Sequence, residues 1–256
     1  MSNRKSFCVI FTVSMLLGLF SSAAAQPRMA MRPALSSQEV ELNNQIRREK
    51  FDFDLPVVMR NNKVDMWIHV MRVEVPDAFG AEELGSISGI FVFTDRGGDR
   101  IERAVIGRRW GATQRQRGED KSDLIEECGA YDIIHDPVFV VEEVGSPMTE
   151  YDFRFKGLRE FVEVRDPQRI AVNFRENLAT WPTGILTNKA EDGISHSDYL
   201  LLTKELGEKY AKRLVSSEYL IMEYINRTAP SEIPLFKKMR KEEVKRVKKA
   251  FDDIVP

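Results

Sequence analysis

Histidine is the residue type most able to do chemistry at neutral pH, and this sequence contains only three: His69, His135 and His196. No two of them have the i, i+4 or His-x-His spacing that places two imidazoles on one metal ion. His69 lies in an apolar run and is expected to be a core residue. His135 precedes Asp136-Pro137 and is expected in a turn. The sequence therefore predicts no metal site of its own.

Two other segments approach known motifs without completing them. Residues 193–197 (Gly-Ile-Ser-His-Ser) nearly match a nucleophile elbow, but the second glycine is missing and no strand leads into the segment. Residues 95–99 (Asp-Arg-Gly-Gly-Asp) could suggest a cation loop, but they lack the further oxygen ligands and the closing glutamate of a calcium site. The first motif is rejected, and the second is interpreted as a hairpin turn.

Cys128 is expected to be structural. Glu126 and Glu127 precede it, and negative charge disfavours the thiolate that a nucleophile needs. The other cysteine, Cys8, lies in a segment expected to be removed, so the mature chain has one thiol and no intrachain disulfide.

The N-terminus has the three parts of a secretory signal peptide over residues 1–25. Arg4 and Lys5 form the positive region, an apolar core covers residues 9–20, and Ser21–Ala25 supply small residues for cleavage. Cleavage is expected after Ala25, which makes the mature protein secreted or periplasmic. An uncleaved anchor is the alternative.

Composition and net charge limit the kinds of protein that the mature part of the chain can be. The net charge of −2 for 256 residues includes Arg4 and Lys5, so cleavage changes it to −2 − 2 = −4. Such a balance does not favour a nucleic-acid partner. No second apolar stretch approaches the roughly 20 residues of a membrane helix, so we expect no membrane span after cleavage. One domain with terminal extensions is the simplest organisation.

The first half of the mature chain alternates helix and strand signals. Ser36 and Glu39 are spaced as a capping box, and the helix that follows is expected to bury Leu42, Ile46, Phe53 and Val57. Pro56 predicts a kink, or a restart with Asp54 as cap. Residues 65–73 are apolar on both faces, which favours a central strand. Residues 90–94 and 100–106 are expected to form a hairpin.

The second half continues the alternation. A short helix is expected over 122–127, strands over 131–134 and 138–142, a helix over 151–162 ended by Asp166-Pro167, and a strand over 170–173. Ser197 is expected to cap a helix closed by Gly207. A strand over 214–216, a helix over 217–226 and a last helix from Ser231 follow. The predicted class is α/β, a mixed sheet flanked by helices, with an extra C-terminal helix.

That last helix is basic and amphipathic. Between Lys237 and Lys249 eight Lys or Arg residues accompany the apolar residues Leu235, Met239, Val247 and Phe251. Such a pattern can bind an anionic surface. The favoured interpretation is a solvated face, or a face that packs on a missing partner.

Several stretches, in order, resemble the exported branch of the creatinase, prolidase and aminopeptidase P family. These stretches, called the family-like stretches below, cover residues 46–52, 55–60, 64–68, 93–103, 166–173, 207–210 and 213–217. The resemblance implies a ribonuclease-H-like N-terminal domain over residues 37–229, after a linker over 26–36. It also implies that residues 230–256 are the first helix of a catalytic domain.

In that family the chemistry uses two divalent ions (Mn, Co or Zn) held by two aspartates, a histidine and two glutamates. The resemblance implies that all five ligands lie beyond Pro256, so no residue here inherits a catalytic or metal role. It implies a subunit-interface or substrate-wall role for Trp67, His69 and Arg72. The family loop after the first strand is absent, and residues 74–88 stand in its place.

The expected function is that of the non-catalytic N-terminal domain of a secreted Xaa-Pro aminopeptidase-like metallopeptidase, with a role in oligomerisation and substrate gating. Its expected partners are its own catalytic domain and, in a homo-oligomer, further copies. A free-standing exported binding or scaffold module is the alternative, and a chain active by itself is the least favoured reading. The peptide substrate, the oligomeric state and the choice between periplasm and exterior stay open.

Overall fold

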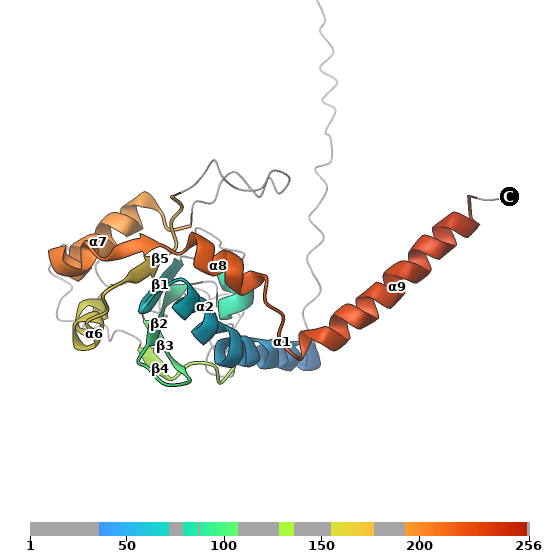
Figure 1. Ribbon diagram of the computed structural model, residues 1–256, viewed down its shortest axis with the longest axis horizontal. Helices are drawn as coiled ribbons and strands as arrows, with labels where there is room; N and C mark the ends of the chain where they lie inside the picture. Colours follow the sequence, from blue (N-terminus) through green and yellow to red (C-terminus); the bar gives the residue numbers. More distant parts are fainter. Residues whose placement is uncertain are drawn as a thin grey trace, which may run out of the picture. The chain divides into compact units, whose positions relative to one another are not determined.

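The computed structural model describes residues 36–71, 79–86, 88–106, 128–135, 155–176 and 193–254. Its centre is a six-stranded mixed sheet of order β4-β3-β2-β1-β5-β6, with helices on both faces (Figure 1). The α/β class predicted from the sequence, with a mixed sheet flanked by helices, is confirmed.

The strands form an antiparallel meander extended by parallel strands. β1 (Met66–Met71), β2 (Gly89–Asp95) and β3 (Ile101–Ile106) pair antiparallel in chain order. β5 (Ile170–Val172) pairs parallel with the free side of β1, and β6 (Leu214–Ser216) pairs parallel with β5. At the other edge β4 (Ile133–His135) pairs parallel with β3. The expected hairpin and the strands near 65–73, 131–134, 170–173 and 214–216 are confirmed.

β1 is covered on both faces, as its two-sided apolar sequence predicts. All six of its residues are buried. Met66, Ile68 and Val70 face a core formed with α6 (Leu158–Arg165) and α7 (His196–Ala211). Trp67 and Met71 face a second core formed with α2 (Leu55–Asn61) and α8 (Glu218–Ile225).

The N-terminal helix begins as predicted and then departs from the prediction. In α1 (Ser37–Glu49) Ser36 and Glu39 form the capping box. One π-helical turn, η1 (Lys50–Asp54), then joins α1 to α2, which carries Pro56 in its first turn. A π turn holds one more residue than an α turn, so the buried face shifts along the sequence. The prediction that Phe53 and Val57 are buried is therefore wrong: they are 63% and 41% exposed.

Two details of α7 also differ from expectation. Ser195 caps it, accepting a hydrogen bond from the Asp198 backbone N–H at 3.2 Å, so the helix begins two residues before the Ser197 cap that was predicted. Gly207 interrupts it with φ 71° and ψ 170°, where the prediction ended the helix, but helical turns continue to Ala211.

The remaining elements are a second π turn, η2 (Gly80–Leu84), and the C-terminal helix α9 (Glu232–Asp252). α8 and α9 match the two helices predicted after Ser217 and Ser231. The predicted helix over 122–127 and strand over 138–142 lie outside the described residues. So does the start of the helix predicted over 151–162, of which α6 is the described part.

Candidate functional site

The described residues hold no group of three or more His, Cys, Asp or Glu side chains placed to bind one metal ion. The three histidines lie on different elements: His69 is buried in β1, whereas His135 at the end of β4 and His196 at the start of α7 are exposed. Ser195 is not arranged as a nucleophile, because its hydroxyl caps α7 and donates to the Asp198 carboxylate at 2.9 Å. Cys128 is buried.

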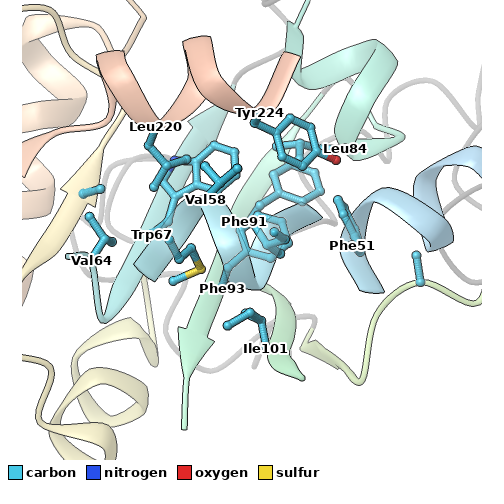
Figure 2. Close-up of a cluster of buried hydrophobic side chains, with 14 of the residues drawn as sticks. Phe51, Val58, Val64, Trp67, Leu84, Phe91, Phe93, Ile101, Leu220 and Tyr224 are labelled. Atoms are coloured by element: carbon cyan, nitrogen blue, oxygen red, sulfur yellow. The ribbon is translucent and has the colours of Figure 1, made fainter. Parts of the chain in front are cut away.

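Two of the three residues singled out for an interface or a substrate wall lie in the core. Trp67 is 0% exposed and His69 is 1% exposed, while Arg72 lies outside the described residues. Trp67 stacks on Phe93, with ring centroids 5.0 Å apart, and lies 6.2 Å from the ring of Tyr224 in α8 (Figure 2). The interface role stays a prediction, and neither described side chain reaches the surface of this chain.

Charged groups border this aromatic cluster. Lys50 of η1 is 3% exposed; its ammonium lies 3.2 Å from the Glu83 carboxylate of η2 and 5.2 Å from the Tyr224 ring centroid. Arg47 donates to the backbone carbonyls of Glu83 and Glu82, each at 2.9 Å. Burial, which disfavours the phenolate, raises the pKa of Tyr224 well above its usual value. These contacts fasten η2 to the N-terminal helices.

Sequence reasoning missed this arrangement. Glu82 and Glu83 fall in the segment 74–88 that replaces the family loop, and nothing in their spacing points to Lys50, which is 33 positions away from Glu83. The one sequence signal is Gly85, whose φ of +85° favours glycine and where an added Cβ would lie 2.7 Å from the guanidinium carbon of Arg47.

A second polar cluster surrounds Asp166, where α6 ends. The carboxylate lies 2.8 Å from the Lys209 ammonium and 2.8 Å from the Arg213 guanidinium, and it accepts a hydrogen bond from the Tyr210 hydroxyl at 3.2 Å. The hydrogen bonds from Lys209 and then Arg213 lower the pKa of Asp166 to about 2. A surface pocket of about 310 Å³ adjoins this cluster, lined in part by Arg159, Lys209 and Tyr210. Its cations are already paired with carboxylates, so we assign the cluster a structural role.

The Asp166 cluster predicts a specific pH dependence. Because the folded-state pKa is below the unfolded value of about 3.9, its stabilisation is complete above that value and is lost as the pH falls through about 2. Asp166→Asn keeps a residue that tolerates the left-handed backbone here (φ 41°) and removes the charge. We expect the variant to have a lower urea midpoint than the parent chain at pH 6. Equal midpoints at pH 6 would contradict this assignment, and the gap should narrow toward pH 2.

Three ion pairs join family-like stretches that are distant in sequence. Arg103, 2% exposed, pairs with Asp52. Arg60 donates to both carboxylate oxygens of Asp95, at 2.8 and 3.1 Å, and Asp166 pairs with Arg213. Each pair therefore links two of the family-like stretches: 46–52 with 93–103, 55–60 with 93–103, and 166–173 with 213–217.

Comparisons with known proteins give no relative: no family model matches the chain, and neither a curated protein nor a solved structure matches it significantly. In the part of the chain that the structure describes, no helix is long and apolar enough to cross a membrane.

Proposed function

We propose that this chain supplies the non-catalytic N-terminal domain of an exported Xaa-Pro aminopeptidase-type metallopeptidase, where it takes part in subunit assembly and walls the path of the substrate. The proposal includes the ribonuclease-H-like version of the mixed sheet and export through the signal sequence over residues 1–25. It assigns the hydrolytic chemistry to a separate catalytic domain.

The observation that carries the proposal is that the family-like stretches hold one another in place. Asp52–Arg103, Arg60–Asp95 and Asp166–Arg213 each connect two such stretches. Trp67, from a further stretch, lies at the centre of one core. The stretches that resemble the family are thus the same stretches that contact one another between elements. This supports a fold shared with the family, because the resemblance then lies in residues that specify the packing.

The strand arrangement supports the same proposal. β1, β2 and β3 form an antiparallel meander, and β5 and β6 continue the sheet parallel to β1. This strand order is the one expected of a ribonuclease-H-like sheet. β4 adds a strand beyond β3 at the opposite edge. The short β5 and β6 each follow a helix, α6 and α7 respectively, which gives the alternating connections of an α/β domain.

The metal pair of the family does not fit the described residues. Two divalent ions need several carboxylates and an imidazole within bonding distance of one another, and no three such groups meet in this part of the chain. No catalytic step is therefore assigned to these residues. The Mn, Co or Zn ions belong, in this proposal, to the catalytic domain.

An activity measurement tests the proposal. The purified chain, incubated with an Ala-Pro-containing peptide and added Mn²⁺ or Co²⁺, is expected to release no N-terminal residue, while an active Xaa-Pro aminopeptidase assayed alongside does. Release that rises in proportion to the chain concentration, and that stays with the chain through gel filtration, would overturn the assignment.

A free-standing exported binding module is the second candidate, and what favours it is the contact of the first turn of α9 with α1. The start of α9 is held by Ser231, which donates to the Glu49 carboxylate from its backbone N–H at 2.8 Å and from its hydroxyl at 2.6 Å. Limited proteolysis separates the two candidates. A self-sufficient module keeps α9 protected, and rapid loss of everything after about residue 228 counts against it.

A further inference from the structure

The helix α9 carries an apolar stripe that no described element covers. None of its 21 residues is buried. The stripe includes Ile233, Phe236 and Val247, which are 45%, 52% and 50% exposed, and in Figure 1 no other described element runs along this helix. Exposed apolar residues aligned on one helix face commonly mark an interaction site. The question is what covers this one.

The stripe follows a heptad spacing. The positions 233, 236, 240, 243, 247 and 250 alternate steps of three and four, the pattern of a helix that packs on another helix. Most of these positions are apolar: Ile233, Phe236, Val247 and Ala250. The two central positions are charged.

Those two central charges, Arg240 and Glu243, decide between possible partners. An anionic lipid surface offers Glu243 no cation from outside its own helix, and taking a charged group out of water is costly. A parallel pair of α9 helices would place Arg240 against Arg240 and Glu243 against Glu243, because equivalent positions meet. An antiparallel pair instead places Arg240 of each copy against Glu243 of the other.

We propose that α9 pairs antiparallel with α9 of a second copy of this chain. In the register set by the Arg240–Glu243 pair, Phe236 faces Val247 of the second copy and Ile233 faces its Ala250. A two-fold axis repeats each contact, as in an isologous dimer. The 21 residues of α9 span about 31 Å at roughly 1.5 Å per residue, enough length for all of these layers.

The charges outside the stripe are compatible with this pairing. Lys241, Lys245 and Lys248 lie on the opposite side of the helix, away from the stripe, by the 100° step per residue of an α-helix. The net positive charge of α9 opposes association at long range, so added salt should strengthen the dimer. A negatively charged vesicle surface would show the opposite salt dependence.

This inference deepens the assembly role proposed above and rests on that part of the proposed function alone. A second domain of the same chain, packing on α9, is the competing occupant of the stripe. The two proposals can fail separately. A chain that does not dimerise through α9 could still lack peptidase activity, and a chain that hydrolyses peptides could still dimerise through α9.

Sedimentation equilibrium of the whole chain tests the pairing. We expect a monomer–dimer equilibrium within about 1 to 200 μM. Arg240→Glu sets Glu against Glu in both central layers, and Glu243→Arg sets Arg against Arg, so each variant alone should raise the dissociation constant at least about tenfold. An equimolar mixture of the two variants restores both ion pairs and should form a heterodimer. The double variant Arg240→Glu/Glu243→Arg should again form a homodimer.

Matched controls carry the same charge changes away from the stripe. Lys241→Glu and Glu242→Arg should leave the dissociation constant within about twofold of the parent value. All these positions are exposed, so circular dichroism should show an unchanged fold. A monomer throughout the concentration range, association insensitive to the two single variants, or no rescue in the mixture would each overturn the proposal. The proposal would also be overturned, in favour of a membrane surface, if the chain bound vesicles of one-third anionic lipid and Arg240→Glu abolished that binding.

Discussion

Trp67→Ala is expected to lower the free energy of unfolding by about 3 to 5 kcal/mol, the range for truncating a large buried aromatic side chain. Trp67 is fully buried and contacts Phe93, Phe79 and Tyr224, which come from β2, the start of η2 and α8. Truncation would leave a cavity where strand and helices meet. Urea denaturation followed by far-UV circular dichroism measures the change.

Two controls separate burial from the substitution itself. Trp67→Phe keeps an aromatic ring and should lose less stability than Trp67→Ala. Val164→Ala, at a position 77% exposed on α6, should change stability by less than about 0.5 kcal/mol. A loss of under about 1 kcal/mol for Trp67→Ala would show that Trp67 is not a central core residue.

Glu83→Ala is expected to lower the free energy of unfolding by about 2 to 3 kcal/mol, because it leaves the buried Lys50 ammonium without its carboxylate. Complete removal of one partner from a fully buried pair costs about 3 to 5 kcal/mol. The expected value is smaller because Glu83 is 26% exposed and water reaches it. Thermal and urea denaturation at neutral pH give the measurement.

Lys50→Met provides the matched variant for this pair. Methionine has a similar volume and no charge to desolvate, so the substitution should cost less than Glu83→Ala despite removing the same ion pair. The double variant Lys50→Met/Glu83→Ala should be more stable than Glu83→Ala alone. A double variant that is less stable than Glu83→Ala would argue that Lys50 is not held as a buried cation.

Local sequence signals predicted much of the fold, because each depends on residues close in the chain. The Ser36–Glu39 capping box, the hairpin around Gly97 and Gly98, and the strand with two apolar faces at 65–73 all appear in the structure. The π turn at residues 50–54 could not be predicted this way. Pro56 predicts an irregularity in the helix, but the packing of the helix on the sheet decides whether it kinks, restarts or forms a π turn.

The ion pairs between elements could not be predicted from the sequence, because their partners are far apart in the chain. Asp52 and Arg103 are 51 positions apart, and Asp166 and Arg213 are 47 apart. Nothing in either local segment identifies its partner; only the folded sheet brings them together. The resemblance selected these segments without indicating that they pair. It also selected Trp67 and His69 for an interface role, whereas the structure places both side chains in the core.

Under the proposed function, this domain serves a metallopeptidase whose metal ligands lie in a separate catalytic domain. Sequencing the genomic DNA that follows the Pro256 codon tests the claim most directly. We expect a frame that encodes two aspartates, a histidine and two glutamates in the order and spacing of a dinuclear metallopeptidase. DNA that encodes no such ligand set in any frame would contradict the claim and favour a free-standing binding module.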